Sequence, residues 1–275
     1  MKNKLAVLCL VFICQYACLN TCEAQGSIDK EKIQQAHPTT KPDSVPKFPE
    51  PEMVLVGGGT FMMGLTRNES GQEHGISNRT HQVTLSSFRI GKYEVTQAEW
   101  QLVMGDSLNF SHNQGCAKCP VEEVSWNDVQ LFIRKLNTIT GRSYRLPTEA
   151  QWEFAAHGGS KSKGYKYAGS DIADEVVFPQ GAFTGKTHPV GGMRPNELGI
   201  YDMSGNVAEW CNDWFDPNNN PGAQTDPQGS PSGFGHVIGG GSWGANPSEC
   251  LITSFRMAYP NDRNAHVGLR LVLIP

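Results

Sequence analysis

Residues 144–156 read YRLPTEAQWEFAA and carry both the start of a helix and its apolar body. Thr148 and Gln151 have the spacing of a capping box, in which each side chain bonds the other residue's backbone N–H at a helix N-terminus. Pro147 fixes the direction of the chain before that cap, because its ring locks φ. A Gly-Gly pair beginning at Gly158 stops the pattern. We therefore predict a short, apolar helix between Thr148 and Gly158.

Two further capping boxes lie upstream of this helix. Thr96 and Glu99 form the first, before a helix that we expect to end by Gly105. Ser125 opens the second, with an Asp three residues later in place of the usual Glu, and Gly141 ends it. The second helix has one apolar face, which predicts packing against a core. That face consists of Val129, Phe132, Ile133 and Leu136.

Short apolar runs around these helices predict strands. A run of three glycines at 57–59 separates the first two, which favours a tight turn between them. The last run alternates apolar residues with others, as a strand with one buried face does. We predict strands at Met53–Val56, Thr60–Met63, Gln82–Leu85, Phe88–Val95, Val237–Ile238 and Val267–Ile274.

Residues 160–235 show almost no regular pattern and are rich in Gly, Pro, Asn and Asp. The whole chain of 275 residues holds 30 Gly and 17 Pro, which excludes a helical bundle or coiled coil because both residues weaken helices. Six Trp and an apolar fraction of 38% oppose disorder throughout. A net charge of −4 opposes nucleic-acid binding. We expect one turn-rich domain with ordered loops.

The first 24 residues have the order of a secretory signal. Lys2 and Lys4 precede the apolar run 5–14, and small residues lead to Ala24. The run is too short to span a membrane, so we predict no transmembrane span. We expect a secreted or periplasmic, envelope-associated protein, with a lipid anchor at Cys22 as an alternative.

The rest of the chain divides in two by composition. Residues 25–51 contain five Pro among polar residues, which is typical of a tether. Residues 52–275 hold every predicted helix and strand. The predicted organisation is therefore a signal peptide at 1–24, a tether at 25–51 and a folded domain at 52–275.

Four cysteines follow the predicted leader: Cys116, Cys119, Cys211 and Cys250. An even number in an oxidising compartment favours disulfides, and the sequence leaves all three pairings open. Cys116-Ala-Lys-Cys119 reads like a redox motif, yet it lies in a polar loop before Pro120, without a βαβ context. We therefore favour a structural clip of that loop.

Seven motifs together resemble the formylglycine-generating enzyme, or sulfatase-modifying factor, family. The resemblance covers about residues 53–274. It implies an α+β, C-type-lectin-like fold with little regular secondary structure, which agrees with the turn-rich composition. The motifs are Met53–Gly64, Tyr93–Gln97, Pro120–Trp126, Tyr144–Ala156, Asn196–Trp210, Gly240–Trp243 and Gly268–Arg270.

The resemblance also implies an activity, the oxidation of a substrate cysteine in sulfatases to formylglycine by O2 and a copper(I) ion held by two thiolates. The family places these cysteines two and seven residues after the aromatic residue that here is Trp243. Cys250 matches the second, but Ala245 stands at the first and has no donor atom. The copper pair is therefore incomplete. Cys250 could pair with Cys211 or act in catalysis, and Ser242 lies beside the groove of the family's site.

A calcium site is a second implication of the resemblance. Asp202 and Glu209 match positions that bind through carboxylates, and Gly205 and Val207 match positions that bind through backbone carbonyls. Such oxygen ligands suit Ca²⁺. In the alternative arrangement, Asp202 caps a turn and Glu209 pairs with a nearby arginine.

Ser242 belongs to a second pattern as well, since a glycine stands two residues to either side of it and Asp262 and His266 follow in the order of serine hydrolases. That fold needs a helix directly behind the serine and a large parallel sheet. The sequence predicts neither of them, so we do not favour a hydrolase.

Three functions remain open. The first is a binding or envelope-assembly module, whose partner is a protein or another component of the cell envelope and whose recognition surface is the groove near 242–250. The second is an oxidoreductase that converts protein cysteine to formylglycine and requires Cys250. The third is a structural subunit of a cell-envelope machine. Ala245 favours the first over the second, and the sequence names neither the partner nor the oligomeric state.

Overall fold

The computed structural model describes residues 48–64, 80–178, 185–216 and 222–274. The predicted signal peptide and the predicted tether up to residue 47 lie outside these residues. The compact unit begins at Phe48, a partly buried residue that packs against the core. Glu50 accepts a hydrogen bond of 3.3 Å from Arg142. Residues just before the first strand are thus attached to the domain.

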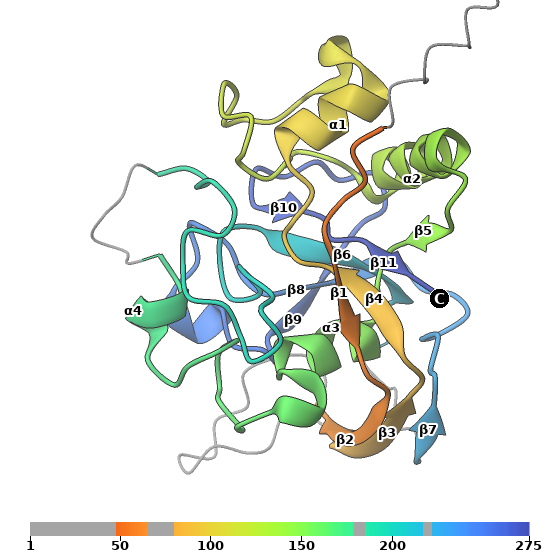
Figure 1. Cartoon of the computed structure of the whole chain (residues 1–275), viewed down its shortest axis with the longest axis vertical. Coiled ribbons are helices and arrows are strands. Elements are labelled where there is room, and N and C mark those ends of the chain that lie inside the picture. Colours follow the sequence, from red (N-terminus) through yellow and green to blue (C-terminus); the bar gives the residue numbers. More distant parts are fainter. Residues whose placement is uncertain (1–47, 65–79, 179–184, 217–221, 275) are drawn as a thin grey trace, which may run out of the picture. The chain divides into compact units, whose positions relative to one another are not determined.

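The described strands form three small sheets (Figure 1). Two strand pairs, β6 with β10 and β3 with β7, are parallel, and the other pairs are antiparallel. In spatial order, the first sheet contains β1 (Met53–Val56), β4 (Phe88–Gly91), β11 (Val272–Leu273) and β5 (Tyr144–Arg145). The second contains β10 (Val267–Gly268), β6 (Ala208–Trp214), β8 (His236–Gly239) and β9 (Phe255–Ala258), and the third contains β2 (Gly59–Met63), β3 (His81–Leu85) and β7 (Gln224–Thr225).

The three predicted helices all form, and each predicted capping box is made. Thr96, Ser125 and Thr148 are the N-caps, and each side chain accepts a hydrogen bond from a backbone N–H in the first turn. No described helix is long and apolar enough to cross a membrane. The helices are α1 (Gln97–Met104), α2 (Trp126–Thr140), α3 (Glu149–Ala156) and the short α4 (Ala173–Val176), with 3₁₀ turns at Asp106–Leu108, Gly159–Lys161 and Pro247–Glu249.

Two apolar clusters form most of the core, and α1, α2 and α3 divide between them, while α4 packs in a third, smaller cluster. In one cluster α1 lies against α2, where the rings of Trp100 and Phe132 stack with centroids 4.8 Å apart. In the other cluster α3 packs against β2 and β6, so that seven of its eight residues are buried. Trp152 of α3 meets Phe255 of β9 edge-on at 5.5 Å. The predicted apolar helix is therefore the central helix of that cluster.

The predicted strand at Val267–Ile274 is wrong as a single element. The structure contains β10 and β11, which belong to different sheets. Arg270 lies between the two strands and is fully buried. Its guanidinium donates hydrogen bonds to the carbonyls of Gly91 and Tyr201, and the chain passes from one sheet to the other at this point. The strand predicted at Phe88–Val95 is also shorter in the structure than in the prediction. Strand β4 ends at Gly91, whose N–H donates a hydrogen bond to Leu271 O.

Candidate functional site

A cavity of about 450 Å³ opens at the end of the second sheet, where we predicted a groove. Its walls come from β8, β9, the Gly-Gly-Ser segment and the loop before β10. In the described part of the chain β9 is the last strand of this sheet. Apolar side chains of the sheet form part of the lining. The polar and charged side chains that line it include Ser242, Glu249, Arg256, Asp262 and His266.

Ser242 and His266 face each other in this cavity. The Ser242 Oγ and His266 Nδ1 atoms lie 3.1 Å apart, and the His266 ring lies 4.3 Å from the ring of Trp243. Burial lowers the pKa of His266, so the imidazole is neutral at pH 7. Asp262 accepts a hydrogen bond from Tyr259 N. A serine and a histidine are thus brought together, while the third residue of the hydrolase pattern binds the backbone.

Cys250 lies beneath the cavity and is fully buried. Burial raises the pKa of its thiol to about 12, so at pH 7 it is a thiol and not a thiolate. Gly241 approaches the sulfur directly, since a Cβ at that position would lie 2.6 Å from Sγ. Ala245 packs against the small apolar cluster that contains Cys250. A methyl group thus stands where the family's first copper ligand is expected, and these residues do not fit the two-thiolate copper site.

The cysteine pairing differs from our expectation for Cys250. Cys116 and Cys119 form a disulfide, whereas Cys211 and Cys250 are free, buried thiols. The expected bond between Cys211 and Cys250 is wrong because each lies in a different part of the core. Cys211 is on β6 in the cluster that contains α3, and Cys250 is in the cluster that contains Tyr167.

Glu209 of the predicted calcium stretch forms a buried ion pair with Arg270. Both side chains have no exposed surface, and their closest atoms are 2.7 Å apart. Trp152 Nε1 also donates to Glu209 Oε2 at 2.7 Å. The guanidinium in addition donates to Gly91 O at 2.9 Å and to Tyr201 O at 2.8 Å. The structure therefore shows Glu209 in the alternative role, bonded to an arginine.

Two more buried carboxylates lie near this pair, on Asp202 and Glu94. Asp202 has a left-handed φ of 61° and accepts a hydrogen bond of 2.6 Å from Gly191 N. Burial raises the pKa of Asp202 to about 6, and burial with the nearby charges of Asp202 and Glu209 raises that of Glu94. Sequence reasoning did not single out Glu94, although it lies in a motif that carried the resemblance.

The calcium ligands predicted from the sequence are thus only partly available. Three carboxylates and one guanidinium share a buried region, which leaves an excess of negative charge that a cation or protons must balance. Asp202 and the carbonyls of Gly205 and Val207 are hard oxygen donors that suit calcium, whereas Glu209 is committed to Arg270. In the described ranges no group of three or more His, Cys, Asp or Glu side chains could hold a metal ion.

Residues 38–274 match the family described as the sulfatase-modifying factor enzyme 1-like domain. The chain belongs to this family. Among relatives, the chaperone protein LppX of Paenibacillus barcinonensis is 33% identical, over 80% of this chain and 89% of that protein. The formylglycine-generating enzyme of Thermomonospora curvata is 34% identical over 57% of this chain. The chain spans about half the length of the two bacterial formylglycine-generating enzymes it matches, 56% and 51%.

Solved structures agree with the fold. Treponema denticola variable protein 1 superposes with a TM-score of 0.72 and 29% identity, over 81% of this chain and 95% of that one. PvdO from Pseudomonas aeruginosa gives a TM-score of 0.70 and 27% identity, over 82% and 95%. These matches confirm the predicted α+β, C-type-lectin-like fold of formylglycine-generating enzymes, with little regular secondary structure.

Proposed function

We propose that this member of the family is a secreted or envelope-associated module that binds or assembles other proteins, with the cavity beside Ser242 as its recognition surface. The proposal rests on that cavity together with Ala245 and Cys250. The cavity is lined by Ser242 and Ala245, while Ala245 supplies no thiolate and Cys250 is buried as a neutral thiol.

The residues that line the cavity suit an extended polypeptide. Arg256, Met257 and Ala258 of the terminal strand β9 line it, and the edge of a sheet is a common place for a peptide to add as a further strand. Arg256 and Glu249 form an ion pair at the rim and supply both signs of charge. The name of the relative LppX, a chaperone protein, also supports a role in handling other polypeptides.

Site-specific photo-crosslinking in the native cell envelope tests this proposal. A benzophenone amino acid replaces Tyr259, which lines the cavity and is 54% exposed. The matched control replaces Leu131, an exposed residue of α2 outside the cavity. We expect protein adducts at 259 and none at 131. Equal or absent adducts at the two positions would contradict the proposed surface, and a fixed stoichiometric complex that co-purifies from membranes would instead favour a structural subunit.

The oxidase hypothesis has a direct test of its own. The purified protein is incubated with copper(I), O2 and a cysteine-containing sulfatase peptide, and aldehyde formation is measured by mass spectrometry. We expect no aldehyde, because one buried thiol cannot replace a pair of thiolates. Aldehyde that forms with the wild type and is lost in Cys250→Ser would overturn the binding-module proposal in favour of catalysis.

Calcium remains part of the proposal as a stabilising ion. Asp202 would provide a carboxylate and Gly205 and Val207 would provide backbone carbonyls, and the excess of buried negative charge near Asp202 supports a cation there. An ion that binds only the folded chain raises its stability by about 2.7 kcal/mol at a hundredfold excess over Kd. We expect EDTA to lower the Tm and added Ca²⁺ to restore it in the wild type but not in Asp202→Asn. An unchanged Tm on chelation would exclude this site.

A further inference from the structure

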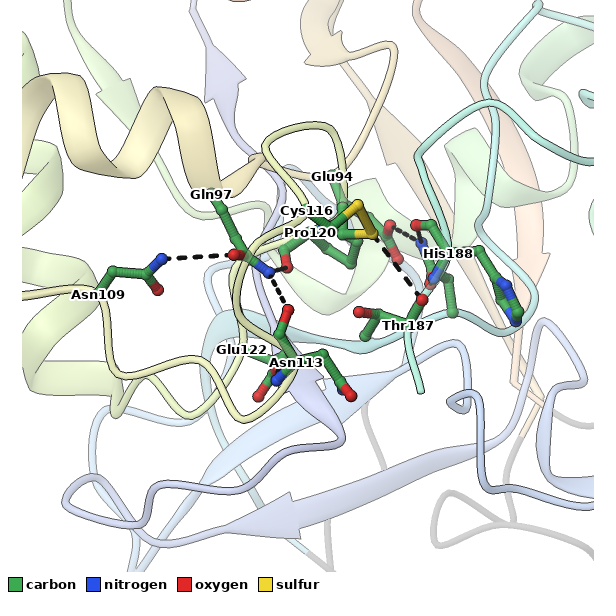
Figure 2. Close-up of a disulfide and its surroundings, with 11 residues drawn as sticks. Glu94, Gln97, Asn109, Asn113, Cys116, Pro120, Glu122, Thr187 and His188 are labelled. Atoms are coloured by element: carbon green, nitrogen blue, oxygen red, sulfur yellow. Dashed lines mark hydrogen bonds between the residues drawn. A yellow bond between two sulfur atoms is a disulfide. The ribbon is translucent and has the colours of Figure 1, made fainter. Parts of the chain in front are cut away.

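The Cys116–Cys119 disulfide, drawn in Figure 2, joins two residues that differ in exposure. Cys116 is partly exposed, whereas Cys119 is 3% exposed. A thiolate arriving from solvent can therefore reach Cys116, and Cys119 is the sheltered sulfur that it would displace. Such a division between an attacked and a leaving sulfur suits thiol–disulfide exchange, because the rate of attack depends on which sulfur is accessible.

The disulfide stabilises its loop less than a bond across a longer loop would. Loop-closure entropy grows with the number of residues enclosed, and a bond between residues three apart encloses very few. The backbone already fixes the loop on the first turn of α1, where Gln97 N donates to Cys119 O at 2.9 Å and Ala98 N donates to Ala117 O at 3.1 Å. Gln97 Nε2 also donates to Asn113 O at 2.9 Å (Figure 2). The loop should therefore keep its shape when the disulfide opens.

The backbone carbonyl of Thr187 can accept a hydrogen bond from the reduced form of Cys119. Thr187 O lies 3.8 Å from Cys119 Sγ, close enough to accept a hydrogen bond from a thiol at that position (Figure 2). A disulfide sulfur has no proton to donate, so this contact is gained only on reduction. The Thr187 hydroxyl is likewise buried without a hydrogen bond among the described residues. Interactions that favour the dithiol make the disulfide a better oxidant.

We propose that Cys116–Cys119 is a thiol–disulfide exchange site that oxidises dithiols in polypeptides. The substrate thiolate attacks Cys116 Sγ, the bond to Cys119 breaks, and Cys119 takes up the proton that the substrate thiol released. The second substrate thiol, once deprotonated, then attacks the substrate sulfur of the mixed disulfide, the bond to Cys116 breaks, and Cys116 takes up the proton that this thiol released. Two electrons pass from the substrate dithiol to the protein disulfide, one substrate disulfide forms, and the chain is left as a dithiol.

The wild-type protein tests the exchange directly. It is mixed with a reduced synthetic peptide that carries two cysteines, and the peptide disulfide and protein thiols are counted by mass spectrometry after acid quenching. We expect one peptide disulfide for each protein disulfide lost, and no oxidation by Cys116→Ser/Cys119→Ser. An intact protein disulfide beside a fully reduced peptide would overturn the proposal and leave a structural clip.

Single variants identify the attacked sulfur. Cys119→Ser leaves the partly exposed thiol, and Cys116→Ser leaves the buried one. With native circular dichroism as the folding check, we expect iodoacetamide to alkylate Cys119→Ser at least tenfold faster than Cys116→Ser. Equal rates in folded proteins would contradict the division of roles. The double variant, which retains Cys211 and Cys250, gives the background rate of the two buried thiols.

Discussion

Substitution of Arg270 tests how much the buried ion pair stabilises the domain, because the guanidinium bonds several groups at once. It donates to both carboxylate oxygens of Glu209 and to the carbonyls of Gly91 and Tyr201. Arg270→Met keeps most of the volume of the stem and removes only these bonds and the charge. Glu209 is then buried without a counter-charge, and Glu94, with its raised pKa, lies nearby.

The expected loss can be worked out from this geometry. Removal of one partner of a buried ion pair costs about 3–5 kcal/mol, because the remaining charge stays desolvated. The two carbonyls also lose charged donors, so we expect a loss of about 5 kcal/mol, which is a large part of the stability of an ordinary domain. Arg270→Lys keeps the charge and loses the bidentate hydrogen bond to Glu209. We expect it to lower the free energy of unfolding by about 2 kcal/mol.

Urea unfolding measures the loss, with an exposed pair as the control. Arg263 bonds Asp128 at 2.8 and 2.9 Å, yet its side chain is 45% exposed, so Arg263→Met should cost no more than about 1 kcal/mol. Midpoints at constant m give the free energies. If Arg270→Met unfolds at the same urea concentration as Arg263→Met, the assignment of Arg270 as the counter-charge of the core is wrong.

Two further predictions concern acid titration and capping. Burial raises the pKa of Asp213 from 3.8 to about 6, so the folded state binds this proton more tightly than the unfolded state does. The stability that this group contributes is complete below pH 4 and is lost as the pH rises through 6, by about 3 kcal/mol. Asp213→Asn should therefore gain stability over the wild type between pH 4 and 8 in urea titrations; a constant difference would contradict the shift. Ser125→Ala removes the cap of α2 and should cost about 1 kcal/mol in thermal unfolding, while Thr138→Ala on the exposed face of the same helix should cost far less; equal losses would refute the role of the cap.

Local signals in the sequence were sufficient for the three longer described helices and for the first strand. Capping boxes act between residues three apart, so Thr96, Ser125 and Thr148 marked three helix starts without any tertiary information. The strand Met53–Val56 was predicted with its observed bounds, because apolar runs flanking three glycines leave few alternatives. The fold class followed from motifs spread over the chain.

The rest depends on partners distant in the sequence. Strand β6 (Ala208–Trp214) is largely buried although it contains Glu209 and Asp213, and its local pattern predicted a loop. Those carboxylates are accommodated by Arg270 and by the backbone N–H of Glu149, respectively. For the same reason the sequence did not reveal the role of Glu94, whose hydrogen bonds go to residues more than a hundred positions away. Composition also left three cysteine pairings open, which only the packing of the core distinguishes.

The division of residues 267–273 between two sheets has a consequence for how the domain is made. Strand β11 is inserted between β4 and β5, and β10 is a parallel neighbour of β6. Until these residues leave the ribosome, β4 and β5 have no strand between them and Glu209 has no counter-charge. The domain must therefore stay incompletely folded until residues 267–273 are available. Pairing across such sequence distances is intrinsically slow, so the folding domain exposes unpaired strands for longer than a fold built from local contacts would.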